Sequence, residues 1–345
     1  MRAYCFWPAA FVLLLLITPC RSAEIRATYR MDWDSNPHEK SGVGRSGLVS
    51  RLFLSATGVP FRHPRGLVVL EQHAGLKRFW TAASPGISLG DVFVNRVALK
   101  ARFSILGSYT ADLNGQIKYK QATRTPAEES YLSSHLLGGI SGQIGAGLAG
   151  RVFFQIGVDE SRDIGVPEAK SMAVGMFWQY RKSRTLQAST SLTYARKTFD
   201  RFVIIARPIS IVGRDLQADD LYSMRFEAQY RLFKLAYLFS NNASNSFGYS
   251  YTSHGAEGLG SRALGHGFDL HAFATFQLRS YENTDAINEL VVDEYAQALA
   301  LLKVARRLGL HYTLSAQLEW SRNGARLGGT FYRKRVFSVS LDAVL

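Results

Sequence analysis

Two serine–histidine pairs are the residues of this chain that most suggest a hydrolytic site, Ser134-His135 and Ser253-His254. A serine nucleophile needs an imidazole within hydrogen-bonding reach, held in place by a third group. Both pairs lie where apolar and polar residues alternate, and neighbours on a β-strand point to opposite faces. We therefore expect neither pair to form a catalytic dyad. No carboxylate pair is placed for glycoside hydrolysis, and we expect no enzyme.

A glycine-rich segment suggests nucleotide binding. Residues 145–150 are Gly-Ala-Gly-Leu-Ala-Gly, which matches the dinucleotide-binding pattern. That mechanism needs a strand before the glycines and a helix after them. Alternating segments flank the glycines on both sides, so the pattern predicts a hairpin turn instead. The eight histidines show no metal-ligand spacing, and we expect neither a cofactor nor a metal.

Charged residues at alternate positions are the other chemistry that the chain offers. The basic members of this face are Arg26, Arg30, Arg51, Arg96, Lys100, Arg102, Lys118, Lys120, Arg151, Arg225 and Arg231. The acids on the same face are fewer: Asp32, Glu71, Asp112, Asp159, Glu227, Asp269 and Glu319. Around water such an excess favours anions, whereas in a packed interior the charges would pair into a network. A polar lining without functional consequence is the alternative.

The elements that must position these charges are β-strands, because apolar and polar residues alternate with a period of two. The pattern is clear at residues 25–33, 109–120, 222–232 and 310–321. A soluble β-sandwich alternates in the same way. The strands here run to about ten residues or more, the length that a tilted strand needs to cross a bilayer. Aromatic residues gather at strand ends on the apolar face, as in membrane barrels.

The links between these strands alternate in length, which predicts the topology. The short links are at 106–107, 149–150, 181–184, 232–233 and 305–308. The long polar links are at 34–46, 121–133, 160–170 and 241–250. Short periplasmic turns and long outer loops are typical of outer-membrane barrels. We therefore expect an all-β, antiparallel, up-and-down transmembrane β-barrel of about sixteen strands, within a range of about fourteen to eighteen.

Three segments leave alternatives open. Residues 249–262 are rich in Gly and Ser and form the weakest strand. Residues 286–306 include strong helix formers, although we expect a strand there because a turn follows. Residues 198–219 are unusually apolar for a loop. They either fold into the lumen, where they would narrow a pore, or form another hairpin, and we expect the inward fold.

The N-terminus has the layout of a secretory signal, with Arg2 before an apolar run and small residues near position 22. We expect residues 1–22 to be cleaved and 23–345 to form a single barrel domain; lipidation at Cys20 is the alternative. Removal of the signal takes away two arginines and no acid, so the net charge falls from +14 to +12. That excess predicts an anionic partner rather than nucleic acid, since the chain is exported.

Strand ends in this chain carry short polar motifs: Asp34-Ser35-Asn36-Pro37, Ser240-Asn241-Asn242 and Asn245 to Tyr249. With these motifs the mature chain resembles a broad class of porin-like bacterial outer-membrane β-barrels, some of which occur in exopolysaccharide gene clusters. The resemblance implies an outer-membrane location and carries no catalytic motif. One departure is the final residue, Leu345, where many such barrels end in an aromatic residue.

The function that follows is a porin-like conduit whose basic lumen favours anionic solutes or polymer. The resemblance implies an alternative, the exit port of an exopolysaccharide pathway with periplasmic export partners. A plugged structural or adhesive barrel is a third. We expect contacts with membrane lipid and lipopolysaccharide in each case. The residues expected to set anion binding and selectivity are Arg96, Lys100, Arg102, Lys118, Lys120, Arg26, Arg30 and Arg225.

Two neighbouring strands allow a sharper prediction about this lumen. A tight turn near Gly107 would set Arg102 across from Asp112 and Arg96 across from Lys118. The first pair can neutralise itself, whereas like charges placed opposite each other are destabilising. Water or a bound anion would screen the second pair. We therefore expect an electropositive spot in the outer half of the lumen.

Overall fold

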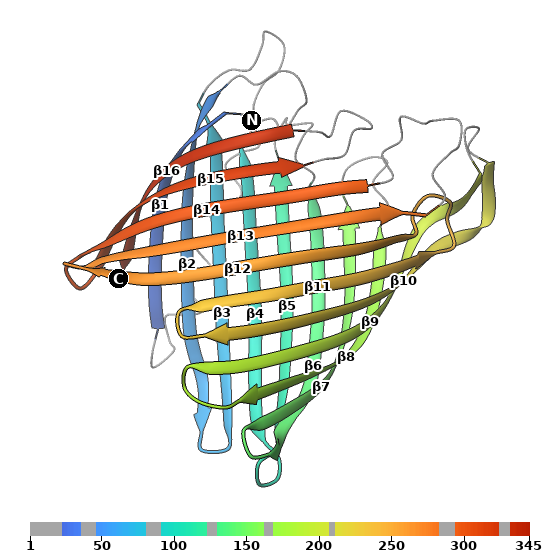
Figure 1. Cartoon of the computed structure of the whole chain (residues 1–345), viewed down its shortest axis with the longest axis horizontal. Coiled ribbons are helices and arrows are strands. Elements are labelled where there is room, and N and C mark those ends of the chain that lie inside the picture. The colour runs from blue at the N-terminus through green and yellow to red at the C-terminus, as the bar shows by residue number, and fades with distance from the viewer. Residues whose placement is uncertain are drawn as a thin grey trace.

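The computed structural model describes residues 23–35, 46–80, 91–122, 130–161, 168–206, 211–282, 294–323 and 332–345. The expected signal at 1–22 lies outside these residues. The described part forms one closed antiparallel barrel in which each strand pairs with its neighbours in sequence (Figure 1). The sixteen strands and their up-and-down order are those predicted.

The strand bounds show a wall of fairly even height with one long exception, the pair β9 and β10. In chain order the strands are β1 Ala23–Asp34, β2 Gly47–His63, β3 Gly66–Phe79, β4 Val92–Ser104, β5 Thr110–Ala122, β6 Tyr131–Gly145, β7 Leu148–Ser161, β8 Ala169–Arg181, β9 Leu186–Ala206, β10 Ile211–Tyr230, β11 Phe233–Ser244, β12 Tyr251–Gly265, β13 Phe268–Tyr281, β14 Glu294–Leu308, β15 Tyr312–Asn323 and β16 Tyr332–Val344. The barrel closes where β1 pairs with β16. The N–H of Leu345 donates to the carbonyl of Ile25 at 2.9 Å, so the aliphatic C-terminus still completes the seam.

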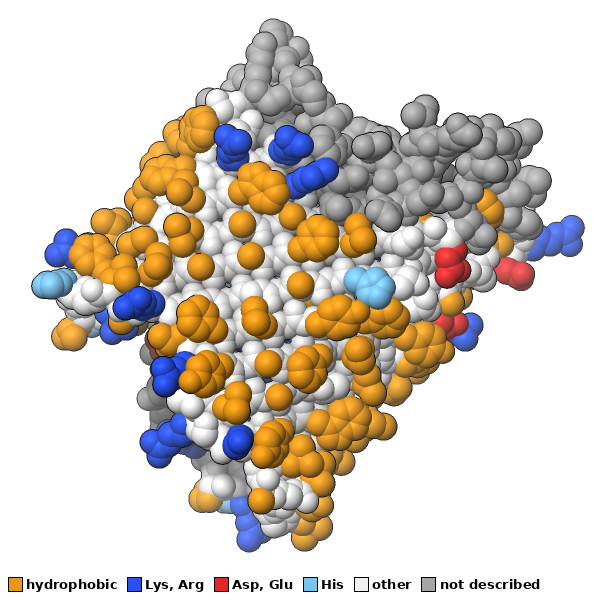
Figure 2. All heavy atoms as spheres, in the orientation of Figure 1, with side chains coloured by type: hydrophobic (Ala, Val, Ile, Leu, Met, Phe, Trp, Pro, Cys, Tyr) orange, Lys and Arg blue, Asp and Glu red, His pale blue; other side chains and the backbone are white. Residues whose placement is uncertain are grey.

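The two faces of the wall follow directly from the alternation. On β1, Tyr29 and Trp33 are 46% and 51% exposed, whereas Asp32 and Asp34 between and beside them are 0% and 2% exposed. Figure 2 shows the outer face covered by hydrophobic side chains, with few charges away from the strand ends. Closure pairs every strand edge, which satisfies the backbone polar groups that an apolar surrounding could not.

The connections confirm the predicted asymmetry of the two ends. Seven short turns lie at one end, at residues 64–65, 105–109, 146–147, 182–185, 231–232, 266–267 and 309–311. Two predicted turns are displaced, because Ala149-Gly150 and Ala305 to Leu308 lie inside β7 and β14. At the first of these, Gly147 takes the turn with a φ of 73°, a conformation that glycine adopts without steric cost.

Two of the uncertain segments are strands. Residues 251–265 form β12, and residues 294–308 form β14, which pairs with β13 along its whole length. The helical alternative for the second segment is therefore excluded for the residues described. Residues 286–293, the start of that segment, lie outside them. Among the described residues, no helix is long and apolar enough to span a membrane.

For residues 198–219 the expected fold into the lumen was wrong, and the alternative of another hairpin is the one that the structure supports. The described residues of this segment, 198–206 and 211–219, continue β9 and β10 as a paired two-stranded extension, with register shifts between Ile211 and Ala218. Residues 207–210 lie outside the described part. Figure 1 shows the paired ends of β9 and β10 projecting past the other strands rather than crossing the barrel interior. The described apolar residues of this segment lie on β9 and β10, whose backbones pair with each other, so no fold into the lumen is needed to accommodate them.

A polar cluster anchors this hairpin to the connection between β11 and β12. Nε of Arg201 donates to Oε1 of Gln217 at 2.6 Å, and Gln217 is 1% exposed. The Arg201 guanidinium lies 5.1 Å from the Phe199 ring centroid and 4.6 Å from that of Tyr249. A guanidinium close to an aromatic ring makes a favourable cation–π contact. The hairpin is therefore a packed extension of the wall.

Candidate functional site: the charged lumen wall

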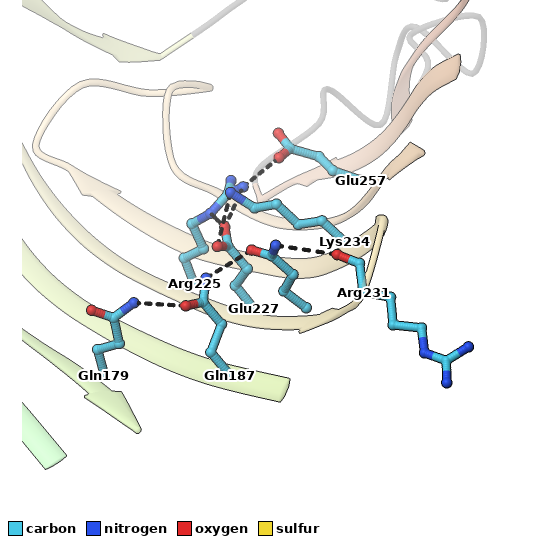
Figure 3. Close-up of polar contacts among 8 residues, drawn as sticks. Gln179, Gln187, Arg225, Glu227, Arg231, Lys234 and Glu257 are labelled. Carbon is cyan, nitrogen blue, oxygen red and sulfur yellow. Dashed lines mark hydrogen bonds and ion pairs between the residues drawn. The ribbon is translucent and has the colours of Figure 1, made fainter. Parts of the chain in front are cut away.

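All eight predicted site residues lie on the inner face, opposite the exposed apolar side chains. Cross-strand pairs show this directly: Arg96 pairs with Lys118 and Arg102 with Asp112, while Val97 pairs with Ile117 on the other face. Arg231, which we expected on the inner face, is in the turn after β10 with a φ of 53°. Figure 3 shows its side chain pointing away from the neighbouring cluster.

Four of the predicted residues are engaged by carboxylates. Arg26 pairs with Glu24, Arg30 with Asp32, Lys100 with Glu71 and Arg225 with Glu257. The Asp32 carboxylate is fully buried and also binds Arg51, at 2.7 Å from Nε. These contacts reduce the positive charge that each residue presents to a solute.

One such cluster lies on β10–β12 and is charge-balanced (Figure 3). Nη2 of Arg225 is 2.6 Å from Oε2 of Glu257 and 3.2 Å from Oε2 of Glu227. Nζ of Lys234 is 2.8 Å from the other oxygen of Glu227. Two cations and two carboxylates therefore cancel.

A ladder of amides continues from this cluster across the wall. Nε2 of Gln187 donates to Oε1 of Gln229 at 2.7 Å, and Nε2 of Gln179 donates to Oε1 of Gln187 at 3.3 Å. Nε2 of Gln229 in turn donates to the carbonyl oxygen of Arg231 at 3.5 Å, so the amides bond to one another and to the backbone (Figure 3). This part of the lumen is polar but carries no excess charge.

The pair Arg96 and Lys118 is different. The two residues stand directly opposite on β4 and β5, in the predicted register. Nε of Arg96 is buried and has no hydrogen-bond partner in the described structure. Nζ of Lys118 lies 5.1 Å above the Tyr131 ring, an interaction that leaves its charge uncompensated. Neither residue forms an ion pair within the described part of the chain.

Arg102 and Asp112 stand opposite each other in the predicted register, but they do not form the ion pair that we expected. Asp112 instead binds Arg151 of β7, which donates from Nε to Oδ1 at 3.1 Å and from Nη2 to Oδ2. Gly139 of β6 lies between them and has no side chain to obstruct the arginine. Arg102 is exposed and is not compensated by Asp112. The cationic strip on β4 and β5 thus comprises Arg96, Arg102 and Lys118.

The structure also brings together a serine, a histidine and an aspartate. We missed this group in the sequence because we considered only serines directly next to a histidine. Ser133 and His135 are two apart, so they share the inner face, with Oγ to Nε2 at 2.8 Å. Oδ1 of Asp159 is 3.4 Å from the same nitrogen. A hydrolytic triad needs the carboxylate on the other ring nitrogen, which here faces Gln155 at 3.5 Å. The cluster therefore lacks the geometry of a triad.

Among the described residues, no three His, Cys, Asp or Glu side chains lie close enough together to hold a metal ion.

Comparison with known proteins places the fold. No family model matches the chain, and no curated protein does. Among solved structures, a BenF-like porin from Pseudomonas fluorescens Pf-5 is similar with a TM-score of 0.55 at 9% identity, over 94% of this chain and 100% of that one. Pseudomonas aeruginosa OccK2 (OpdF), solved in complex with glucuronate, has a TM-score of 0.52 at 11% identity, over 94% and 99%. The outer membrane protein opdK of the same species has a TM-score of 0.52 at 8% identity, over 94% and 100%.

Proposed function

We propose that this chain is an outer-membrane conduit that favours small anionic solutes. Its fold is that of outer-membrane porins, as predicted from the sequence. The observation that carries the preference for anions is the pair Arg96 and Lys118, two lumen cations placed opposite each other without a carboxylate partner.

The physical argument begins with the cost of that pair. Like charges directly opposite on a sheet repel, and a buried guanidinium nitrogen without a partner adds to the cost. Water offsets part of this cost, and a passing carboxylate or phosphate offsets more because both cations can donate to it. A ring or strip of such charges raises the local concentration of anions and favours their passage.

The positive charge is concentrated on one wall of the lumen, because the opposite wall is charge-balanced. β12 is eight strands from β4 in a closed barrel of sixteen, so the two strands lie on opposite walls. The wall at β10–β12 carries the balanced cluster around Arg225 and Glu257. A solute in the channel therefore meets net positive charge from the β4–β5 side. One structural neighbour binds glucuronate, and a small carboxylate of that kind suits paired cations.

The test is the double charge reversal R96E/K118E, measured as reversal potential in a salt gradient across a planar bilayer. We expect the preference for anions to fall or to invert, with little change in single-channel conductance. The matched control is K182E/R184E, which changes the charge equally in the exposed turn at 182–185. An unchanged reversal potential in R96E/K118E, or an equal shift in the control, would contradict the proposal.

The same recording separates the other functions that the sequence left open. A conduit gives open-channel currents, whereas a plugged adhesive barrel is silent and an export port is silent without its partners. The location has its own test, because a closed barrel resists detergent and migrates faster on a gel before heating than after. Recovery of the mature protein from the soluble periplasm would rule out the outer-membrane location.

A further inference from the structure

Three arginines lie on the outer face of the barrel at the outer ends of β15 and β16. β16 begins with the run Arg333-Lys334-Arg335, and the alternation separates its members. Lys334 points inward, where its Nζ is 3.0 Å from Oδ2 of the buried Asp34. Arg333 and Arg335 are exposed on the opposite face. Arg322 of β15 is exposed too and is the direct cross-strand partner of Arg333.

These arginines adjoin aromatic side chains of the apolar band. Trp320 is the cross-strand partner of Arg335, and Trp33 pairs with Phe337 across the seam. The exposed fractions of Trp320, Trp33 and Phe337 are 38%, 51% and 44%. Figure 2 shows basic side chains gathered near the outer ends of β15 and β16, beside hydrophobic ones. Aromatic residues at this height mark the boundary between hydrocarbon and headgroups.

We propose that Arg322, Arg333 and Arg335 bind the phosphate of a phosphorylated glycolipid in the outer leaflet. The inference requires the outer-membrane location proposed above, but it does not depend on anion passage, because these side chains face away from the lumen. Arg322 and Arg333 are direct cross-strand partners on the outer face, so two guanidinium-bearing residues lie beside each other there. Guanidinium groups bind phosphate through two parallel hydrogen bonds, which suits a pair of arginines.

The surroundings favour a lipid over a free anion. Below the arginines the same face continues with Phe337, Leu318 and Val339, which are 44%, 57% and 41% exposed. Acyl chains would cover this apolar surface while the phosphate lies among the arginines. A soluble anion would use only the charged part, and its affinity would gain nothing from the apolar band. Basic residues next to a membrane surface attract anionic headgroups in this manner.

The experiment titrates folded protein in zwitterionic detergent with bis-phosphorylated lipid A and measures binding by native mass spectrometry. Each arginine near an anionic surface contributes about a factor of five in affinity, so R322Q/R333Q should weaken binding by roughly 30-fold. Chemically dephosphorylated lipid A should bind the wild-type protein about as weakly, and the variant should not distinguish the two lipids. The matched control is R262Q, an exposed outward arginine near the turn at 266–267, at the other end of the barrel.

Three results would overturn the proposed lipid site. Wild-type affinity in R322Q/R333Q, or an equal loss in R262Q, would overturn the site. Displacement of lipid A by inorganic phosphate at a similar concentration would show a free-anion site and overturn the lipid assignment. The heat-dependent gel shift verifies that each variant is folded. Single-channel conductance and reversal potential should not change in R322Q/R333Q, so failure of this inference and failure of the anion conduit remain distinguishable.

Discussion

Substitution of Gly139 by alanine tests the packing that holds the lumen charges in place. A Cβ at this position would lie 2.8 Å from Nε of Arg151 and 3.0 Å from the carbonyl oxygen of Val152. Real Cβ atoms essentially never come closer than 3.0 Å to such neighbours. The backbone oxygen cannot move independently of the strand, so the arginine must leave its position over residue 139. Its bidentate contact with Asp112 would then be lost.

The magnitude follows from two destabilising terms and one stabilising term. Overpacking of this kind costs about 1–3 kcal/mol. Loss of the charge-assisted contact adds about 1 kcal/mol, a reduced value because both side chains are partly exposed to the lumen. Replacement of a strand glycine by alanine returns about 0.5–1 kcal/mol through the entropy of the unfolded chain. We expect G139A to lower the free energy of unfolding by about 2 kcal/mol.

The assay is urea unfolding of the folded protein in micelles, followed by tryptophan fluorescence. G115A is the matched control, because a Cβ at Gly115 on the outer face meets only Cδ1 of Leu136, at an ordinary 3.7 Å. Its stability should equal or slightly exceed that of the wild type. The reversal potential of G139A should stay unchanged, since Asp112 and Arg151 both keep their charges. Equal stability of G139A and G115A would refute the packing argument.

Two further outcomes follow from the structure. E257Q removes the carboxylate 2.6 Å from Arg225 and raises the net lumen charge by one, so the reversal potential should shift towards greater anion preference; a shift towards cations would show that the cluster does not face the conducting path. Replacement of residues 202–216 by a short glycine turn should leave single-channel conductance unchanged, because this hairpin extends the wall and does not cross the lumen; a rise in conductance would restore the inward-folding hypothesis.

The local pattern was sufficient to predict the architecture. A period of two assigns each side chain to a face without knowledge of its partners, so the alternation at 25–33 and 222–232 identified strands and their inner residues. The alternation of short and long links then predicted the direction of each strand and the number of strands. The register of Arg96 with Lys118 was also predictable, because a tight turn near Gly107 fixes which residues face each other across adjacent strands.

The partners of the lumen charges were not predictable in this way. Asp112 binds Arg151, which is 39 residues away and not on an adjacent strand, through a gap left by Gly139. Such a contact depends on how side chains lean across a third strand. The cluster of Ser133, His135 and Asp159 likewise needed the register of β6 with β7.

Residues 198–219 show the same division between local pattern and tertiary structure. Their apolar content is evident in the sequence, but it is compatible with an inward loop and with a hairpin. Pairing of β9 with β10 beyond their neighbours decides for the hairpin, and Arg201 and Gln217 secure it. Alternation therefore determined which face each strand residue occupies, because that depends only on the chain's own geometry. The choice of charge partners and the course of this hairpin were decided only by the closed barrel, because they depend on contacts between residues distant in sequence.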